Sequence, residues 1–301
     1  MRDPGERASA APAIVADMSH IAVTTSLERT YRYLRIGVAG TVVAILLAVA
    51  QAATTYGWLT SISDYFYTPA RDVFVGALVA ASLALFALSG RGVERALFDA
   101  AALFAPLIAL VPTTLAPGAV PGVLIDCPGV ERCFPMQYEP DAANGVFVYV
   151  VVGGLVVLVA LLLAALRQLS LAGVWPSLLI ALVVLAVVAL TWALAHETFL
   201  QYAHFAATIA FFGLFAAAAV RNAFPRQGPP PSPVFRTLYI AIATGLVALL
   251  VTYAIVLPQA TAAETPIVLV VETAALALFF AFWVVQGVEK WPDTDPSIVA
   301  R

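Results

Sequence analysis

The chain has 301 residues, of which 62% are hydrophobic and 11% are charged, whereas a soluble domain is about half apolar and about a quarter charged. This composition excludes a soluble globular enzyme, and it leaves too few polar residues for a disordered chain. The formal net charge of −3 provides no basic surface for nucleic acid. An integral protein of the lipid bilayer is the class that remains.

Eight apolar segments are long enough to cross a membrane, because about 20 helical residues span a hydrocarbon core of about 30 Å. We therefore predict an all-α, polytopic protein with eight transmembrane helices within residues 36–288. Residues 1–35 precede the first span, which is too long for the apolar core of a cleavable signal peptide, and residues 289–301 form a tail. The predicted spans are Ile36–Thr55, Val73–Ser89, Leu97–Ala116, Val146–Leu166, Ser177–Ala195, Ala203–Val220, Thr237–Leu257 and Pro266–Gly287.

The positive charges support this count and predict an orientation. With eight spans, 13 of the 15 Lys and Arg residues fall on one side of the membrane, and only Arg71 and Arg132 fall on the other. Because cytoplasmic loops retain positive charge during insertion, we expect both terminal segments to be cytoplasmic and the protein to lie in the plasma membrane. Small residues such as those at Gly37, Gly40, Gly76 and Gly153-Gly154 are expected to let helices approach closely.

Two loops have distinctive compositions. The proline-rich stretch 226–233 predicts a stiff cytoplasmic connector between the sixth and seventh spans. The outer loop 117–145 holds the only two cysteines, Cys127 and Cys133, with a turn-forming Pro-Gly pair between them. On the oxidising side of a membrane this spacing favours a disulfide, and two free thiols are the alternative.

Ionisable groups inside or beside the apolar segments are the candidates for function, because each is costly in hydrocarbon and needs a partner. Glu272 lies about 9 Å inside the last span, at 1.5 Å per residue, and its neighbours in sequence are apolar, so we expect it to face the bundle. Arg71 and Asp72 begin the second span at the same membrane face, and His204 begins the sixth. The loop before Arg71 adds Ser61, Ser63, Asp64 and Tyr65.

Each candidate also has a purely structural interpretation. Arg71 and Asp72 can form an interfacial ion pair, since the start of a helix favours an acidic group. His204 can bond to a loop carbonyl, and Glu272 can take up a proton or pair with Arg71 or His204. A zinc site would require His196, His204 and a carboxylate to converge, which the spacing allows but does not imply. The sequence indicates no other cofactor.

Several of these segments together resemble a known group of proteins. The stretch 61–76 (SISDYFYTPARDVFVG), the later 109–113 (ALVPT), the histidine-opened helix at 203–207 (AHFAA) and the last helix with Glu272 are similar to a group of bacterial multi-pass membrane proteins defined by a domain of unknown function. More remotely, the order of the Ile-Ser-Asp loop, a helix and a histidine-opened helix resembles the Frag1/DRAM/Sfk1 membrane proteins, which are linked to lipid organisation. Those proteins have six helices, so the fourth and fifth spans here would be additions. The resemblance implies no particular activity.

From these observations we expect a polar pocket in the outer leaflet, beneath the loops 56–70 and 127–133. Its expected role is to bind a small polar molecule or a lipid headgroup. Arg71 would hold an anionic group, Tyr65 and His204 would form hydrogen bonds with the ligand, and Glu272 would set the charge of the pocket. Two alternatives stay open: a zinc-dependent lipid hydrolase, and a proton- or ion-coupled transporter that uses Glu272. The sequence leaves the oligomeric state open.

Overall fold

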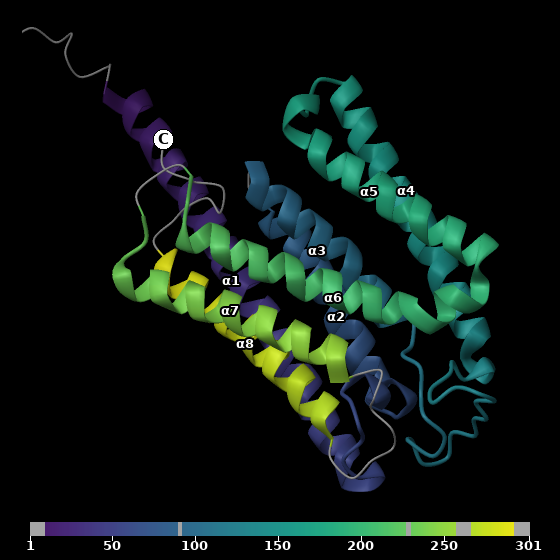
Figure 1. Cartoon of the computed structure of the whole chain (residues 1–301). Coiled ribbons are helices and arrows are strands. Elements are labelled where there is room, and N and C mark those ends of the chain that lie inside the picture. Colours follow the sequence, from purple (N-terminus) through teal and green to yellow (C-terminus); the bar gives the residue numbers. More distant parts are fainter. Residues whose placement is uncertain (1–9, 90–91, 227–229, 257–265, 292–301) are drawn as a thin grey trace, which may run out of the picture.

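The fold is a bundle of long helices, seen in a computed structural model that describes residues 10–89, 92–226, 230–256 and 266–291. Within these residues no strand is present, and two short 3-10 helices, η2 (Ser63–Tyr67) and η3 (Met136–Tyr138), lie in loops at one end (Figure 1). The long helices are α1 (Ala10–Tyr56), α2 (Arg71–Leu88), α3 (Gly92–Leu110), α4 (Glu139–Ala165), α5 (Leu171–Leu194), α6 (His196–Ala223), α7 (Pro233–Val256) and α8 (Ile267–Glu289).

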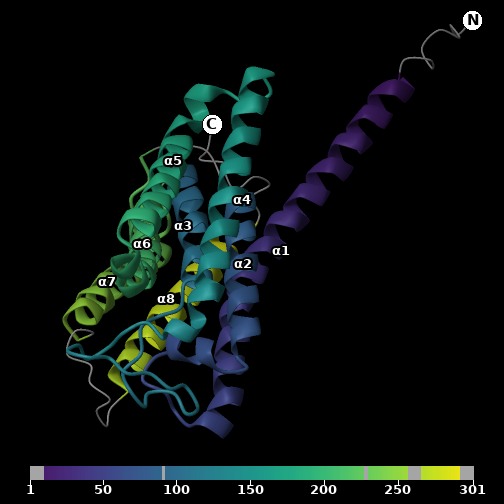
Figure 2. The ribbon, with the colours of Figure 1, turned by 90° about the vertical axis from the view of Figure 1, so that its right-hand side faces the viewer.

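Seven of these helices are long and apolar enough to cross a membrane: all except α3, over the part of the chain that the structure describes. The architecture is therefore that of a membrane-embedded, all-helical protein. The first span begins at Glu28, within α1, and the earlier part of α1 extends away from the bundle (Figure 2). The proline-rich connector 226–233 and the terminal segments lie partly outside the described residues.

The helix α3 lies inside the bundle, where it packs against α2 and α6. Small residues, Ala100–Ala102, Ala105 and Ala109, form part of its buried surface and are almost completely buried. Small side chains let neighbouring backbones come close, so α3 occupies the narrow space between its neighbours. The α4–α5 pair lies to one side, with much of its apolar surface exposed where lipid would contact it (Figure 1).

Glycines allow close packing only at some of the predicted positions. A Cβ added at Gly153 would lie 2.6 Å from Leu185 of α5, and one at Gly145 would lie 3.0 Å from Leu110 of α3. These two glycines therefore mark close approaches. A Cβ added at Gly37, Gly40, Gly76 or Gly154 would meet nothing within 4 Å, so the expectation of close helix contact is wrong there.

A cluster of aromatic rings fills the interior of the bundle. It is built from α3, α6 and α8, with ring centroids between 4.5 and 6.4 Å apart in mostly edge-on or tilted pairs. Such pairs are favourable beyond the area that they bury. The aromatic cluster comprises Phe98, Phe211, Phe215, Phe279, Phe282 and Trp283.

Candidate functional site

The loop between α1 and α2, residues 57–70, closes one end of the bundle. All of its residues from Ser61 to Thr68 are buried, and the Leu269 N–H at the start of α8 donates to the Thr60 carbonyl at 2.8 Å. The Tyr65 hydroxyl accepts from the Leu59 N–H at 3.1 Å and donates to the Gly57 carbonyl at 3.0 Å. Tyr65 therefore braces the loop internally, and a role in binding a ligand stays a prediction.

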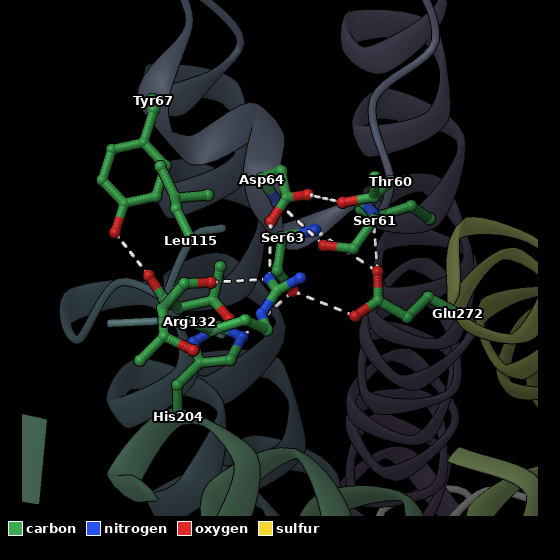
Figure 3. A network of polar contacts seen from close by, with 12 residues as sticks. Thr60, Ser61, Ser63, Asp64, Tyr67, Leu115, Arg132, His204 and Glu272 are labelled. Carbon is green, nitrogen blue, oxygen red and sulfur yellow. Dashed lines mark hydrogen bonds and ion pairs between the residues drawn. The ribbon is translucent and has the colours of Figure 1, made fainter. Parts of the chain in front are cut away.

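Glu272 points from α8 into this loop, as Figure 3 shows. One carboxylate oxygen, Oε2, accepts from the backbone N–H groups of Ile62 at 2.6 Å and Ser63 at 3.3 Å. The other, Oε1, lies 3.3 Å from the Ser63 hydroxyl. Glu272 thus faces the bundle as predicted, but its partners are loop donors and not Arg71.

His204 of α6 contacts the same serine from the opposite side. Its Nδ1 lies 2.8 Å from the Val111 carbonyl oxygen and its Nε2 lies 3.0 Å from Ser63 Oγ. A carbonyl oxygen can only accept, so Nδ1 carries a proton and Nε2 of the neutral ring accepts. Ser63 has one proton to donate, and both His204 and Glu272 lie within its reach. The side chains of Ser63, His204 and Glu272 therefore form one hydrogen-bonded group, which we call the serine cluster.

Asp64 and Arg132 form a buried ion pair next to the serine cluster. The Arg132 Nη2 lies 3.4 Å from Asp64 Oδ1 and donates to the Thr114 carbonyl at 2.6 Å. Asp64 also accepts from the Thr60 hydroxyl, and its own N–H donates to the Ser61 hydroxyl oxygen at 3.0 Å. Burial raises the pKa of the Asp64 carboxyl, and the nearby Arg132 guanidinium opposes that rise.

The disulfide loop positions Arg132. Cys127 and Cys133 are joined by a disulfide, which confirms the prediction. The backbones of Cys133 and Leu115 exchange two hydrogen bonds, at 2.9 and 3.0 Å, so the residue before Cys133 is held against the bundle. From the sequence, Arg132 is only one of two positive charges expected on the outer side. The signal that could have found it is its place beside a cysteine in a loop whose other charges are acidic.

Arg71 and Asp72 lie outside the serine cluster. The Arg71 Nη1 forms an ion pair with Asp141 Oδ2 at 2.9 Å, and its guanidinium lies 4.5 Å from the centre of the Phe66 ring. Asp72 is exposed. Arg71 is paired within the protein because α4 begins earlier than predicted and brings Asp141 to this position. An anionic ligand at Arg71 stays a prediction.

The two candidate zinc ligands do not converge. The His196 Nε2 lies 3.5 Å from Glu139 Oε1, and its ring packs edge-on against Trp192 at 4.3 Å. His204 uses both ring nitrogens in other hydrogen bonds. Among the described residues, no three His, Cys, Asp or Glu side chains are grouped to hold a metal ion. In this structure His196 and His204 are therefore held by separate partners, and zinc binding by the two stays a prediction.

A cavity of about 50 Å³ lies directly below the loop, between α1, α2, α6 and α8. Its polar atoms come from Ser63 and Glu272 at the roof and from Thr41 and Thr208 on the walls, and its other lining residues are apolar. A water molecule needs roughly 10–15 Å³ of such space, so the cavity is large enough for a few waters or for the end of one small group. Two members of the serine cluster, Ser63 and Glu272, line this cavity.

These features define the class of protein: an all-helical, membrane-embedded bundle with a buried polar cluster at one end. Comparisons of the chain with protein-family models, with curated proteins and with solved structures find no match.

Proposed function

We propose that this protein binds a small polar molecule or a lipid headgroup at the serine cluster, in the outer leaflet of the plasma membrane. The observation that carries the proposal is the cavity with a roof of Ser63 and Glu272 and with largely apolar walls. Buried acids in a membrane protein are costly and commonly mark a site. An amphiphile matches this lining, with its polar end at the roof and hydrocarbon between the helices.

The charges around the cavity favour a ligand that donates hydrogen bonds. Arg71 is paired with Asp141, and Arg132 is paired with Asp64 and Thr114. Glu272 accepts two backbone hydrogen bonds, and its Oε1 competes with His204 for the Ser63 hydroxyl proton, whereas a carboxylate has about four acceptor positions. A hydroxyl or ammonium group can use a remaining position, whereas an anionic group would face this acid while Arg71 and Arg132 are already paired.

A set of 12-carbon probes tests this proposal. Wild-type protein in lipid nanodiscs would be melted with dodecylamine, dodecanol or laurate, since a ligand that binds the native state raises Tm. We expect the amine and the alcohol to raise Tm more than laurate does. Glu272→Gln should weaken the apparent affinity for the amine about tenfold, because a charge-assisted hydrogen bond contributes about 1.5–3 kcal/mol.

Asp72→Asn is the matched control, because it removes an acidic charge at the same end of the bundle but outside the cavity. It should leave all three responses unchanged. The proposal fails when laurate raises Tm the most. It also fails when Glu272→Gln and Asp72→Asn change the apparent affinity for dodecylamine by the same factor.

The topology belongs to the same proposal. We infer that α3 is the eighth span and that both terminal segments are cytoplasmic, because this arrangement places 13 of the 15 basic residues on one side. The serine cluster then lies at the outer face, where a disulfide forms readily.

The two alternative functions have less support. For hydrolysis, the Ser63–His204 contact resembles a nucleophile with its base, but the N–H groups of Ile62 and Ser63, which could stabilise an oxyanion, already bind Glu272. For transport, the aromatic cluster fills the bundle beyond the cavity. We therefore favour binding over turnover or transport.

A further inference from the structure

A second cavity, of about 360 Å³, lies between α1 and α8 at the end of the bundle opposite the serine cluster. Its lining combines two arginines, Arg32 and Arg35, with apolar and small residues of both helices. Many of the apolar residues here are exposed on the surface of the bundle, including Ile36, Val43 and Val284. The space is therefore a groove that opens to the side, and we call it the α1–α8 groove.

The arginines are held at the mouth of this groove by contacts with the end of α8. The Arg32 Nε donates to the Trp291 carbonyl at 2.9 Å, and its guanidinium lies 4.8 Å from the centre of the Trp291 ring. The Arg35 Nη1 donates to the Lys290 carbonyl at 3.0 Å. Arg32 also forms an ion pair with Glu28, at 3.6 Å. Two guanidiniums are thus fixed at the mouth: Arg35 is buried there, and Arg32 is partly exposed.

The polarity of the groove changes along its length. On α1, Arg32 is followed at successive turns by Ile36, Gly40 and Val43, a distance of about 16 Å at 1.5 Å per residue. The antiparallel α8 supplies Phe280 at the far end, and Trp291, which follows α8, lies at the same end as Arg32. The groove is therefore basic at one end and apolar along the rest.

A missing side chain opens the middle of the groove. Gly40 lines it, and a Cβ added there would meet nothing within 4 Å. A residue of ordinary size would occupy this space, whereas glycine leaves it for a chain that lies against the helix.

We propose that the α1–α8 groove binds one anionic phospholipid of the adjacent leaflet. The phosphate would lie at Arg32 and Arg35, since guanidinium groups match phosphate oxygens in geometry and charge. One acyl chain would lie along Gly40 and Val43. Tryptophans such as Trp291 are common at the headgroup level, which is where this arrangement places the mouth. The proposal is independent of any ligand at the serine cluster.

The test measures lipid retention by native mass spectrometry, after release from nanodiscs made of equal parts phosphatidylglycerol and phosphatidylcholine. We expect one phosphatidylglycerol to be retained per chain in preference to phosphatidylcholine. Arg32→Gln should lower that preference about fivefold, the effect of one basic residue near an anionic lipid surface. Arg29→Gln is the matched control, because Arg29 is exposed on the same helix and does not line the groove.

A second pair of variants tests the acyl-chain position without changing any charge. Gly40→Leu fills the groove, and we expect it to reduce phosphatidylglycerol retention at least fivefold. Gly76→Leu is its control, because Gly76 is an exposed helical glycine with equally open surroundings and lies outside the groove. A Tm close to the wild-type value verifies that each variant is folded.

Three results would overturn the proposal: equal retention of the two lipids, equal effects of Arg32→Gln and Arg29→Gln, or unchanged retention in Gly40→Leu. Displacement of the lipid by millimolar inorganic phosphate would also overturn it, because a free anion would then be the occupant.

Discussion

Ser63 is the residue on which the candidate site depends. Its single hydroxyl proton can go to His204 or to Glu272, but not to both. When neutral His204 accepts it, the facing Glu272 oxygen needs its own proton to keep a hydrogen bond to Ser63. The charge of Glu272 is therefore coupled to the direction in which one hydroxyl points. A ligand that donates to Glu272 would favour the charged form of this acid.

The pair of Asp64 and Arg132 yields a prediction about pH. Burial already raises the pKa of Asp64 above its ordinary value of 3.8, and Arg132 opposes that rise. In Arg132→Met the pKa of folded Asp64 should rise further, so the folded state binds this proton more tightly than the unfolded state does. The stability from this group is then present below pH 3.8 and is lost as the pH rises through the raised pKa.

We therefore expect the Tm deficit of Arg132→Met, relative to wild type, to grow as the pH is raised from about 4 toward neutrality. Thermal unfolding in nanodiscs across this range measures it. The double variant Arg132→Met with Asp64→Asn should lose this pH dependence, because the titrating group is gone. A deficit that is constant with pH, or that shrinks as the pH rises, would contradict the assignment.

At the level of elements, most of the helices begin earlier than their apolar segments. The helix α4 starts at Glu139, where Pro140 suits the first turn and where Glu139 and Asp141 complement the helix dipole. The helix α6 likewise starts at His196, seven residues before the predicted start of the sixth span at Ala203. Hydropathy locates the part of a helix inside hydrocarbon and misses a polar first turn. Two contacts of candidate site residues, Arg71 with Asp141 and His196 with Glu139, involve these first turns.

Close packing of α3 on α4 gives a second prediction. A Cβ at Gly145 would lie 3.0 Å from the Leu110 Cβ and 3.1 Å from the Leu110 carbonyl oxygen, and a backbone atom cannot rotate away. We expect Gly145→Leu to lower the free energy of unfolding by about 1–3 kcal/mol, the usual cost of overpacking. Gly154→Leu, on the same helix but in open space, should have little effect. Chemical or thermal unfolding compares the two, and equal stabilities would show that α3 and α4 are not in close contact.

At the level of the whole molecule, polar groups are concentrated at the two ends and aromatic rings fill the space between. The serine cluster lies under the loops at one end, and the α1–α8 groove lies at the other. Each end would contact a different leaflet in a protein that spans the bilayer. This arrangement gives the two proposed sites separate access to lipid.

The topology can be tested with single cysteines in a variant whose Cys127 and Cys133 are replaced by serine. Cysteines introduced at Trp58, at Glu131 and at Gln168, all exposed, would be treated with a membrane-impermeant maleimide. In intact cells we expect labelling at positions 58 and 131 but not at 168, which should react only after lysis. The proposed eighth span is wrong when positions 58 and 131 react on opposite sides.

Much of this protein follows from the sequence alone. Its membrane class, most of the helices, the Cys127–Cys133 disulfide and the inward direction of Glu272 are all visible there, because hydrophobicity and the cost of a buried charge act on short segments. The partners of Glu272 depend on tertiary structure, since Ser63 is 209 positions away in the chain. The same holds for Asp64 with Arg132 and for the open space at Gly40. Which buried donor meets which acceptor is decided by how the helices pack, and no local pattern of residues encodes that packing.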